Sequence, residues 1–130
     1  MDDQRVHLHR ILVLVKLDAQ RLFERISERY PEYIGIYSLK RTRDHFAVIF
    51  TNRFRQMKIK ELSAIDPELI VALDNFYSRA EHMEWYLYTT EDLPQAVSDR
   101  VMRYISDLRS KLETINIHIE AELSSWKYQV

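Results

Sequence analysis

Residues 92–126 read DLPQAVSDRVMRYISDLRSKLETINIHIEAELSSW. Apolar side chains recur along this run at steps of 4, 4, 3, 4, 3, 4, 4 and 3, about 3.6 residues per turn: Val97, Val101, Ile105, Leu108, Leu112, Ile115, Ile119, Leu123 and Trp126. This period predicts a long amphipathic helix with almost no supercoil and one continuous apolar stripe. The rest of the chain must supply the groove in which this helix lies.

The composition indicates one all-helical domain over residues 1–130. A chain of 130 residues with 46% hydrophobic content is long enough to bury a core. It contains one glycine and three prolines, so it has few sites for tight turns. A β-sandwich or barrel needs many such turns, and we therefore expect an all-α fold.

Three more helices are predicted upstream. The first covers about residues 3–30 and the second about 43–62, and the third begins with Asp66 as N-cap and Pro67 at its first helical position. The apolar stripe of the first helix is Leu8, Leu12, Val15, Ala19, Leu22 and Ile26. The stripe of the third is Leu69, Leu73, Phe76, Ala80, Met83 and Leu87. Short connections favour an antiparallel up-down-up-down four-helix bundle with long first and last helices.

The segment 33–51 also permits a hairpin. Residues 33–37 and 45–51 are rich in strand-forming side chains, and 40–44 could form the turn between them. We favour a second helix because one helical face gathers apolar side chains that a strand would scatter. They are Phe46, Ile49, Phe50, Phe54 and Met57.

Charge is divided between two consecutive segments. Residues 40–60 carry seven basic side chains against Asp44, and 61–92 carry eight acidic side chains against Arg79. The opposite signs suggest that the second and third helices complement each other. Outward-pointing Arg55 and Lys58 resemble a nucleic-acid surface, but the adjoining acidic helix would repel a phosphate backbone.

Two charged residues fall inside predicted apolar faces. They are Arg53 on the second helix and Glu84 on the third, and we expect a partly buried ion pair between them. This polar site could fix the register of the helices, or it could bind a small ligand or metal. The alternative is that both side chains lie at the edges of their stripes and reach water.

No motif for catalysis, metal or cofactor binding is present. The chain has no cysteine, and a single glycine excludes glycine-rich phosphate loops and nucleophile elbows. His118 and Glu122 are one turn apart, but two ligands do not make a metal site. Neither a signal peptide nor an apolar run long enough for a membrane span is recognisable, so we expect a cytoplasmic, non-enzymatic protein.

Spare apolar surface predicts self-association. At 1.5 Å per residue the first and last helices would be about 42 and 51 Å long, whereas the middle two would be about 30 and 34 Å. The overhanging ends would share one end of the bundle and present Val6, Val13, Leu17 and Ile117 away from the core. We expect a homodimer or a partner helix there, although a few exposed aliphatic side chains are ordinary on monomers.

A second candidate surface lies on the third helix. Val71, His82, Trp85 and Tyr86 lie away from its core stripe. An outward tryptophan could anchor a protein partner. Alternatively, an extended N-terminal segment or residues 33–39 could cover it. The interpretation most consistent with the sequence is an interaction or adaptor module that self-associates.

Overall fold

The computed structural model describes residues 3–31, 33 and 46–127, and this part of the chain contains helices and no β-strand. Its three long helices are α1 (Asp3–Glu28), α5 (Pro67–Thr89) and α6 (Pro94–Lys127). Between α1 and α5 lie α3 (Phe46–Ile49), the 3₁₀ helix η1 (Phe54–Gln56) and α4 (Ile59–Leu62). The all-helical class expected from the sequence is confirmed.

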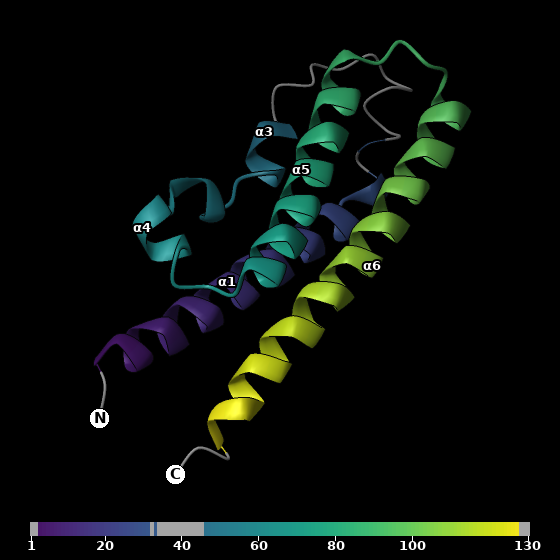
Figure 1. Ribbon diagram of the computed structural model, residues 1–130. Coiled ribbons are helices and arrows are strands. Elements are labelled where there is room, and N and C mark those ends of the chain that lie inside the picture. The colour runs from purple at the N-terminus through teal and green to yellow at the C-terminus, as the bar shows by residue number, and fades with distance from the viewer. Residues whose placement is uncertain (1–2, 32, 34–45, 128–130) are drawn as a thin grey trace.

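The last helix, α6, is in contact with both of the other long helices. It packs along both α5 and α1, while the short α3 contacts α1 and α5. Figure 1 shows α6 running antiparallel to both of its long neighbours, so that the start of α1 and the end of α6 lie at the same end of the molecule. With 34 residues α6 is about 51 Å long, against about 35 Å for the 23 residues of α5.

The predicted stripes of the long helices form the core. On α6 the buried members are Val97, Val101, Ile105, Leu108, Leu112, Ile115 and Ile119. On α1 they are Leu12, Val15, Ala19, Leu22 and Ile26, and on α5 all six predicted residues are buried: Leu69, Leu73, Phe76, Ala80, Met83 and Leu87. Burial of each large aliphatic side chain contributes about 1.5–3 kcal/mol, so these stripes hold the long helices together.

Proline helps to set the boundaries of the long helices. Pro67 occupies the first turn of α5, and the carbonyl of Asp66 accepts hydrogen bonds from the backbone N–H groups of Leu69 and Ile70, both at 3.0 Å. Proline suits this position because its ring presets the helical φ and its missing N–H would have no partner there. The predicted start of this helix is confirmed.

The predicted continuous second helix over 43–62 is wrong for the residues that the structure describes. Helical structure stops after Ile49 and resumes only as η1 and α4. The hairpin alternative also fails where it can be followed, because residues 46–49 are helical; residues 34–45 lie outside the described part of the chain. The four-helix up-down topology is accordingly not confirmed.

Side chains of α1 explain why this helix is interrupted. In a continuous helix the N–H of Arg53 would bond to the carbonyl of Ile49. Instead, a carboxylate oxygen of Asp18 accepts from the Arg53 N–H at 2.9 Å, and Arg25 Nε donates to the Ile49 carbonyl at 3.2 Å. Thus side chains of α1 bind both the donor and the acceptor of a hydrogen bond that a continuous helix would form.

Two residues further on, a second helical hydrogen bond is replaced in the same way, because its donor and its acceptor each bind a different side chain. The N–H of Arg55 would bond to the carbonyl of Thr51 in a helix, but it donates to the side-chain oxygen of Asn52 at 3.1 Å. The Thr51 carbonyl accepts from Arg25 Nη2 instead. Asparagine commonly captures nearby backbone N–H groups in turns. The chain therefore runs irregularly from 50 to 53, alongside α1.

Candidate functional site

Asp18 is the centre of the contact between α1 and residues 51–56. One carboxylate oxygen accepts from the Arg53 N–H, and the other accepts from the Phe54 N–H at 3.3 Å and from the Tyr77 hydroxyl at 2.6 Å. Three donors on one carboxylate occupy most of its accepting capacity. Asp18 therefore ties α1, the start of η1 and the middle of α5 together.

Tyr77 supports this arrangement from α5. Burial, with the Asp18 carboxylate beside it, raises the pKa of the Tyr77 hydroxyl far above its ordinary value, so the group stays protonated and remains a donor. Its ring stacks on Phe54, with centroids 4.3 Å apart and an interplanar angle of 2°. The stacked pair fixes η1 against α5 and keeps the Phe54 N–H directed at Asp18.

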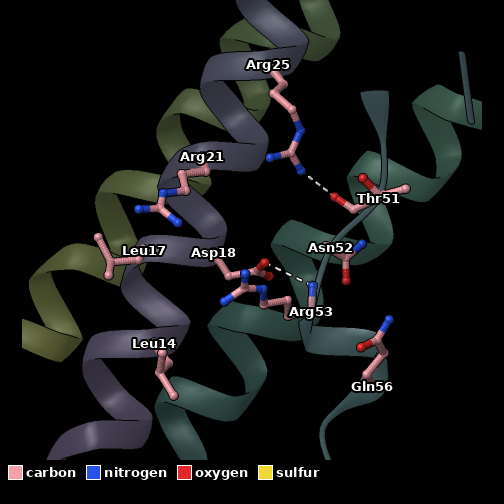
Figure 2. Close-up of a pocket in the computed structure, with 9 residues that line it drawn as sticks. All are labelled: Leu14, Leu17, Asp18, Arg21, Arg25, Thr51, Asn52, Arg53 and Gln56. Carbon is pink, nitrogen blue, oxygen red and sulfur yellow. Dashed lines mark hydrogen bonds between the residues drawn. The ribbon is translucent and has the colours of Figure 1, made fainter. Parts of the chain in front are cut away.

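A cavity of about 310 Å³ opens beside Asp18, between α1 and the 51–56 segment. Residues of α1 that line it are Leu14, Leu17, Asp18, Arg21 and Arg25; the opposite side is lined by residues 51–53 and Gln56. Figure 2 shows Arg25 reaching from α1 to Thr51, and Arg53 extending from the facing segment back towards Asp18. Three guanidinium groups thus border one opening.

The three arginines differ in how they are held. Arg25 is anchored through Nε and Nη2 by the carbonyls of Ile49 and Thr51, whereas Arg21 and Arg53 are exposed. Within the described part of the chain, no carboxylate forms an ion pair with any of the three. The cavity therefore carries three cations and a single acid, whose oxygens already accept three hydrogen bonds.

The structure does not bring the predicted pair Arg53 and Glu84 together. Arg53 is exposed beside Asp18, and Arg55 instead lies 2.9 Å from Glu81 and 3.7 Å from Glu84. The prediction placed Arg53 in the register of an unbroken helix, and the break after Ile49 removes that register. Partial burial raises the pKa of Glu84, and the Arg55 charge opposes this effect.

The residues predicted to form an interface lie on exposed or half-exposed surface. On α1, Val13 is 36% and Leu17 43% exposed, and Val6 is half-buried. On α6, Ile117 is 68% exposed. Lys16 and Glu120 form an ion pair that joins the two helices near these residues. The expected direction of these side chains is thus observed, and their role in assembly stays a prediction.

The second predicted surface is only partly exposed. Trp85 is 62% exposed, and Val71 and His82 are exposed too, but Tyr86 is buried at 9% and donates to Asp92 at 2.8 Å. Tyr86 turns inward because α6 begins directly beside the end of α5. Its inclusion in an exposed surface is wrong.

His82 is held against α6. The His82 Nδ1 lies 2.7 Å from the Tyr104 hydroxyl, and Arg79 stacks over the Tyr104 ring at 4.4 Å while pairing with Asp107 at 2.8 Å. Through these contacts the polar side chains of His82 and Arg79 join α5 to α6 beside Trp85.

The two candidate covers for the surface around Trp85 were an extended N-terminal segment and residues 33–39. From Asp3 the N-terminal segment is helical, as part of α1. Of 33–39 the structure describes Tyr33, which is buried and donates to the carbonyl of Ile26 at 2.8 Å; 34–39 lie outside the described residues.

The cavity arginines on α1 were not among the site residues predicted from the sequence. Asp18, Arg21 and Arg25 follow at steps of three and four, the spacing of one helical face, and this signal was available. What the spacing could not reveal was the position of the 51–56 segment against that face. The described residues contain no group of three or more histidine, aspartate or glutamate side chains placed to hold a metal ion.

Comparison of the chain with protein-family models, curated protein sequences and solved structures finds no match. Among the helices described, none combines the length and the apolar character needed to span a membrane.

Proposed function

We propose that this chain is a non-enzymatic interaction module that forms a homodimer through the outward face of α1. One observation supports the proposal most directly: an exposed helical face has an apolar centre at Val13 and Leu17, with Arg10 before it and, beyond Arg21, the acidic pair Glu24 and Glu28 after it. A surface of this kind is complementary to a second copy of itself related by a two-fold axis.

The outward face of α1 consists of residues within about 40° of Leu17, given a helix that advances about 100° per residue. They are Asp3, Val6, Arg10, Val13, Leu17, Arg21, Glu24 and Glu28. Each of them is exposed except Val6, which is half-buried. The face therefore extends over most of α1 without cover from its own subunit.

Charge complementarity favours a second copy of the chain as the partner. If two α1 helices lie antiparallel and cross at Leu17, Arg10 of one copy comes opposite Glu24 of the other, since both lie seven residues from Leu17. The two-fold axis produces this pair twice. The two Leu17 side chains then meet at the centre, where desolvation of aliphatic side chains contributes most. Val13 of each copy lies opposite the aliphatic stem of Arg21 of the other, since both are four residues from Leu17.

Ile117 extends the apolar surface onto α6. It lies one turn before Glu120, whose carboxylate pairs with Lys16 across the seam between the two helices. Residues three apart share one side of a helix, so Ile117 is close to the α1 face. In the proposed dimer it flanks the central contact.

Analytical ultracentrifugation tests the proposal. We expect the wild-type chain to sediment as a dimer at micromolar concentration, and Leu17→Glu to raise the dimer dissociation constant at least about a hundredfold, because the symmetry brings two carboxylates together in an apolar contact. The matched control is Val71→Glu, which adds the same charge at an exposed aliphatic residue of α5. That control should remain dimeric.

A charge swap tests the antiparallel geometry. Glu24→Arg should weaken the dimer because it places two guanidinium groups opposite each other, and adding Arg10→Glu should restore it by reversing both signs. A monomeric wild type would refute the proposal, and so would a dimer that Leu17→Glu leaves unchanged. A dimer that the double variant fails to restore would exclude the antiparallel pairing at Leu17.

A further inference from the structure

We propose that the cavity between α1 and residues 51–56 is a binding site for a small phosphate monoester. Arg21, Arg25 and Arg53 border it, and Asp18 is the acid among its lining residues. Arginine suits this chemistry because its planar fork of N–H donors matches the oxygens of phosphate. The cavity shares Leu17 and Arg21 with the α1 face, whereas its other lining residues lie outside that face, and binding of the ester does not require the dimer.

Asp18 compensates only one of the three positive charges that border the cavity. Its carboxylate accepts from the Arg53 N–H, the Phe54 N–H and the Tyr77 hydroxyl, and it cannot turn to an arginine without breaking these bonds. Three guanidinium groups against one carboxylate leave a net charge of about two. A phosphate monoester carries about −1.5 to −2 at neutral pH, whereas a carboxylate or a phosphodiester carries −1.

Arg25 is preorganised for an anion. Its Nε and Nη2 donate to the carbonyls of Ile49 and Thr51, which hold the guanidinium plane in place. Arginine has five N–H donors, so Nη1 still has donors for a ligand oxygen. A donor that is already fixed loses little conformational entropy when the ligand binds.

The remaining wall of the cavity limits the size and character of the ester group. Leu14 and Leu17 supply apolar surface, 54% and 43% exposed, and the volume of about 310 Å³ lies at the lower end of ligand pockets. An ester group of one ring or a short alkyl chain would cover these leucines. Phenyl phosphate has this composition and serves as the probe.

Isothermal titration calorimetry on the full chain at low ionic strength provides the test. We expect phenyl phosphate to bind with one saturable site per chain, inorganic phosphate to bind more weakly, and the diester methyl phenyl phosphate to bind at least about tenfold more weakly than phenyl phosphate. Affinity for phenyl phosphate should also fall as the pH is lowered through about 6, where the monoester gains a proton.

Arg53→Gln should weaken phenyl phosphate binding about tenfold to a hundredfold, since it removes charged hydrogen bonds. Arg53 bonds to Asp18 through its backbone, so the substitution leaves that anchor intact. Arg53→Lys keeps the charge but loses the fork and should give an intermediate affinity. The control Arg103→Gln removes the same charge from an exposed position on α6, and we expect its affinity to stay within about twofold of wild type.

Absence of saturable binding of phenyl phosphate to the wild-type chain would overturn the proposal. Equal losses in Arg53→Gln and Arg103→Gln would also overturn it, because they would indicate attraction by overall charge. Arg53 lies outside the α1 face, so sedimentation of Arg53→Gln separates the two proposals: a dimer that no longer binds the probe supports this site independently of self-association.

Discussion

At the scale of single residues, Asp18 carries most of the contact between α1 and the irregular segment. We predict that Asp18→Ala lowers the free energy of unfolding by about 2–4 kcal/mol, because it removes three hydrogen bonds and leaves the Tyr77 hydroxyl buried without its acceptor. Urea unfolding followed by circular dichroism measures this change. The loss should exceed that of Tyr77→Phe, which removes one of the three bonds.

A matched control separates these bonds from the loss of a negative charge. Asp74→Ala removes the same group from an exposed position of α5, where the carboxylate accepts one long bond of 3.5 Å from Ser78. We expect that variant to stay within about 0.5 kcal/mol of wild type. Equal losses in the two aspartate variants would contradict the role assigned to Asp18.

At the scale of elements, α6 is stabilised by the burial of its stripe and little by its ends. Leu108 is fully buried near the middle of the helix, whereas Leu93, directly before the helix begins, is 77% exposed. We predict that Leu108→Ala costs about 2–5 kcal/mol through lost burial and the resulting cavity. The same substitution at Leu93 should cost less than about 0.5 kcal/mol. Thermal and urea unfolding of both variants measure the difference.

The pair of leucine variants also tests the position of α6 between its neighbours. A cost at Leu108 no larger than that at Leu93 would mean that the stripe does not face α1 and α5. Because both variants carry the same substitution, differences in side-chain chemistry do not enter the comparison.

At the scale of the whole molecule, dimer formation should be coupled to stability. Association stabilises the folded chain by mass action, so the midpoint of thermal unfolding rises with protein concentration. We predict a midpoint that increases by several degrees between low and high micromolar wild type, measured by calorimetry. Leu17→Glu should show almost no dependence on concentration, and Val71→Glu should behave as wild type. A wild-type midpoint independent of concentration would contradict self-association.

The stripes of the long helices could be predicted from the sequence because helical periodicity is a local property. The step pattern of 92–126 indicated the buried face of α6 from Val97 to Ile119, and Asp66-Pro67 indicated the start of α5. The outward direction of Val13 and Leu17 followed from the same periodicity. These features depend on residues three or four apart, so they needed no knowledge of the rest of the chain.

The segment from 46 to 62 and the cavity beside it were decided by tertiary contacts. Its apolar spacing fits a helix, but Asp18 and Arg25, more than 20 residues upstream, bind the backbone groups that such a helix would use. The break then places Arg55, in place of Arg53, at Glu84 and brings Arg53 to the cavity. A local sequence pattern does not show this competition, because the competing side chains reach the segment only after α1 has packed against it.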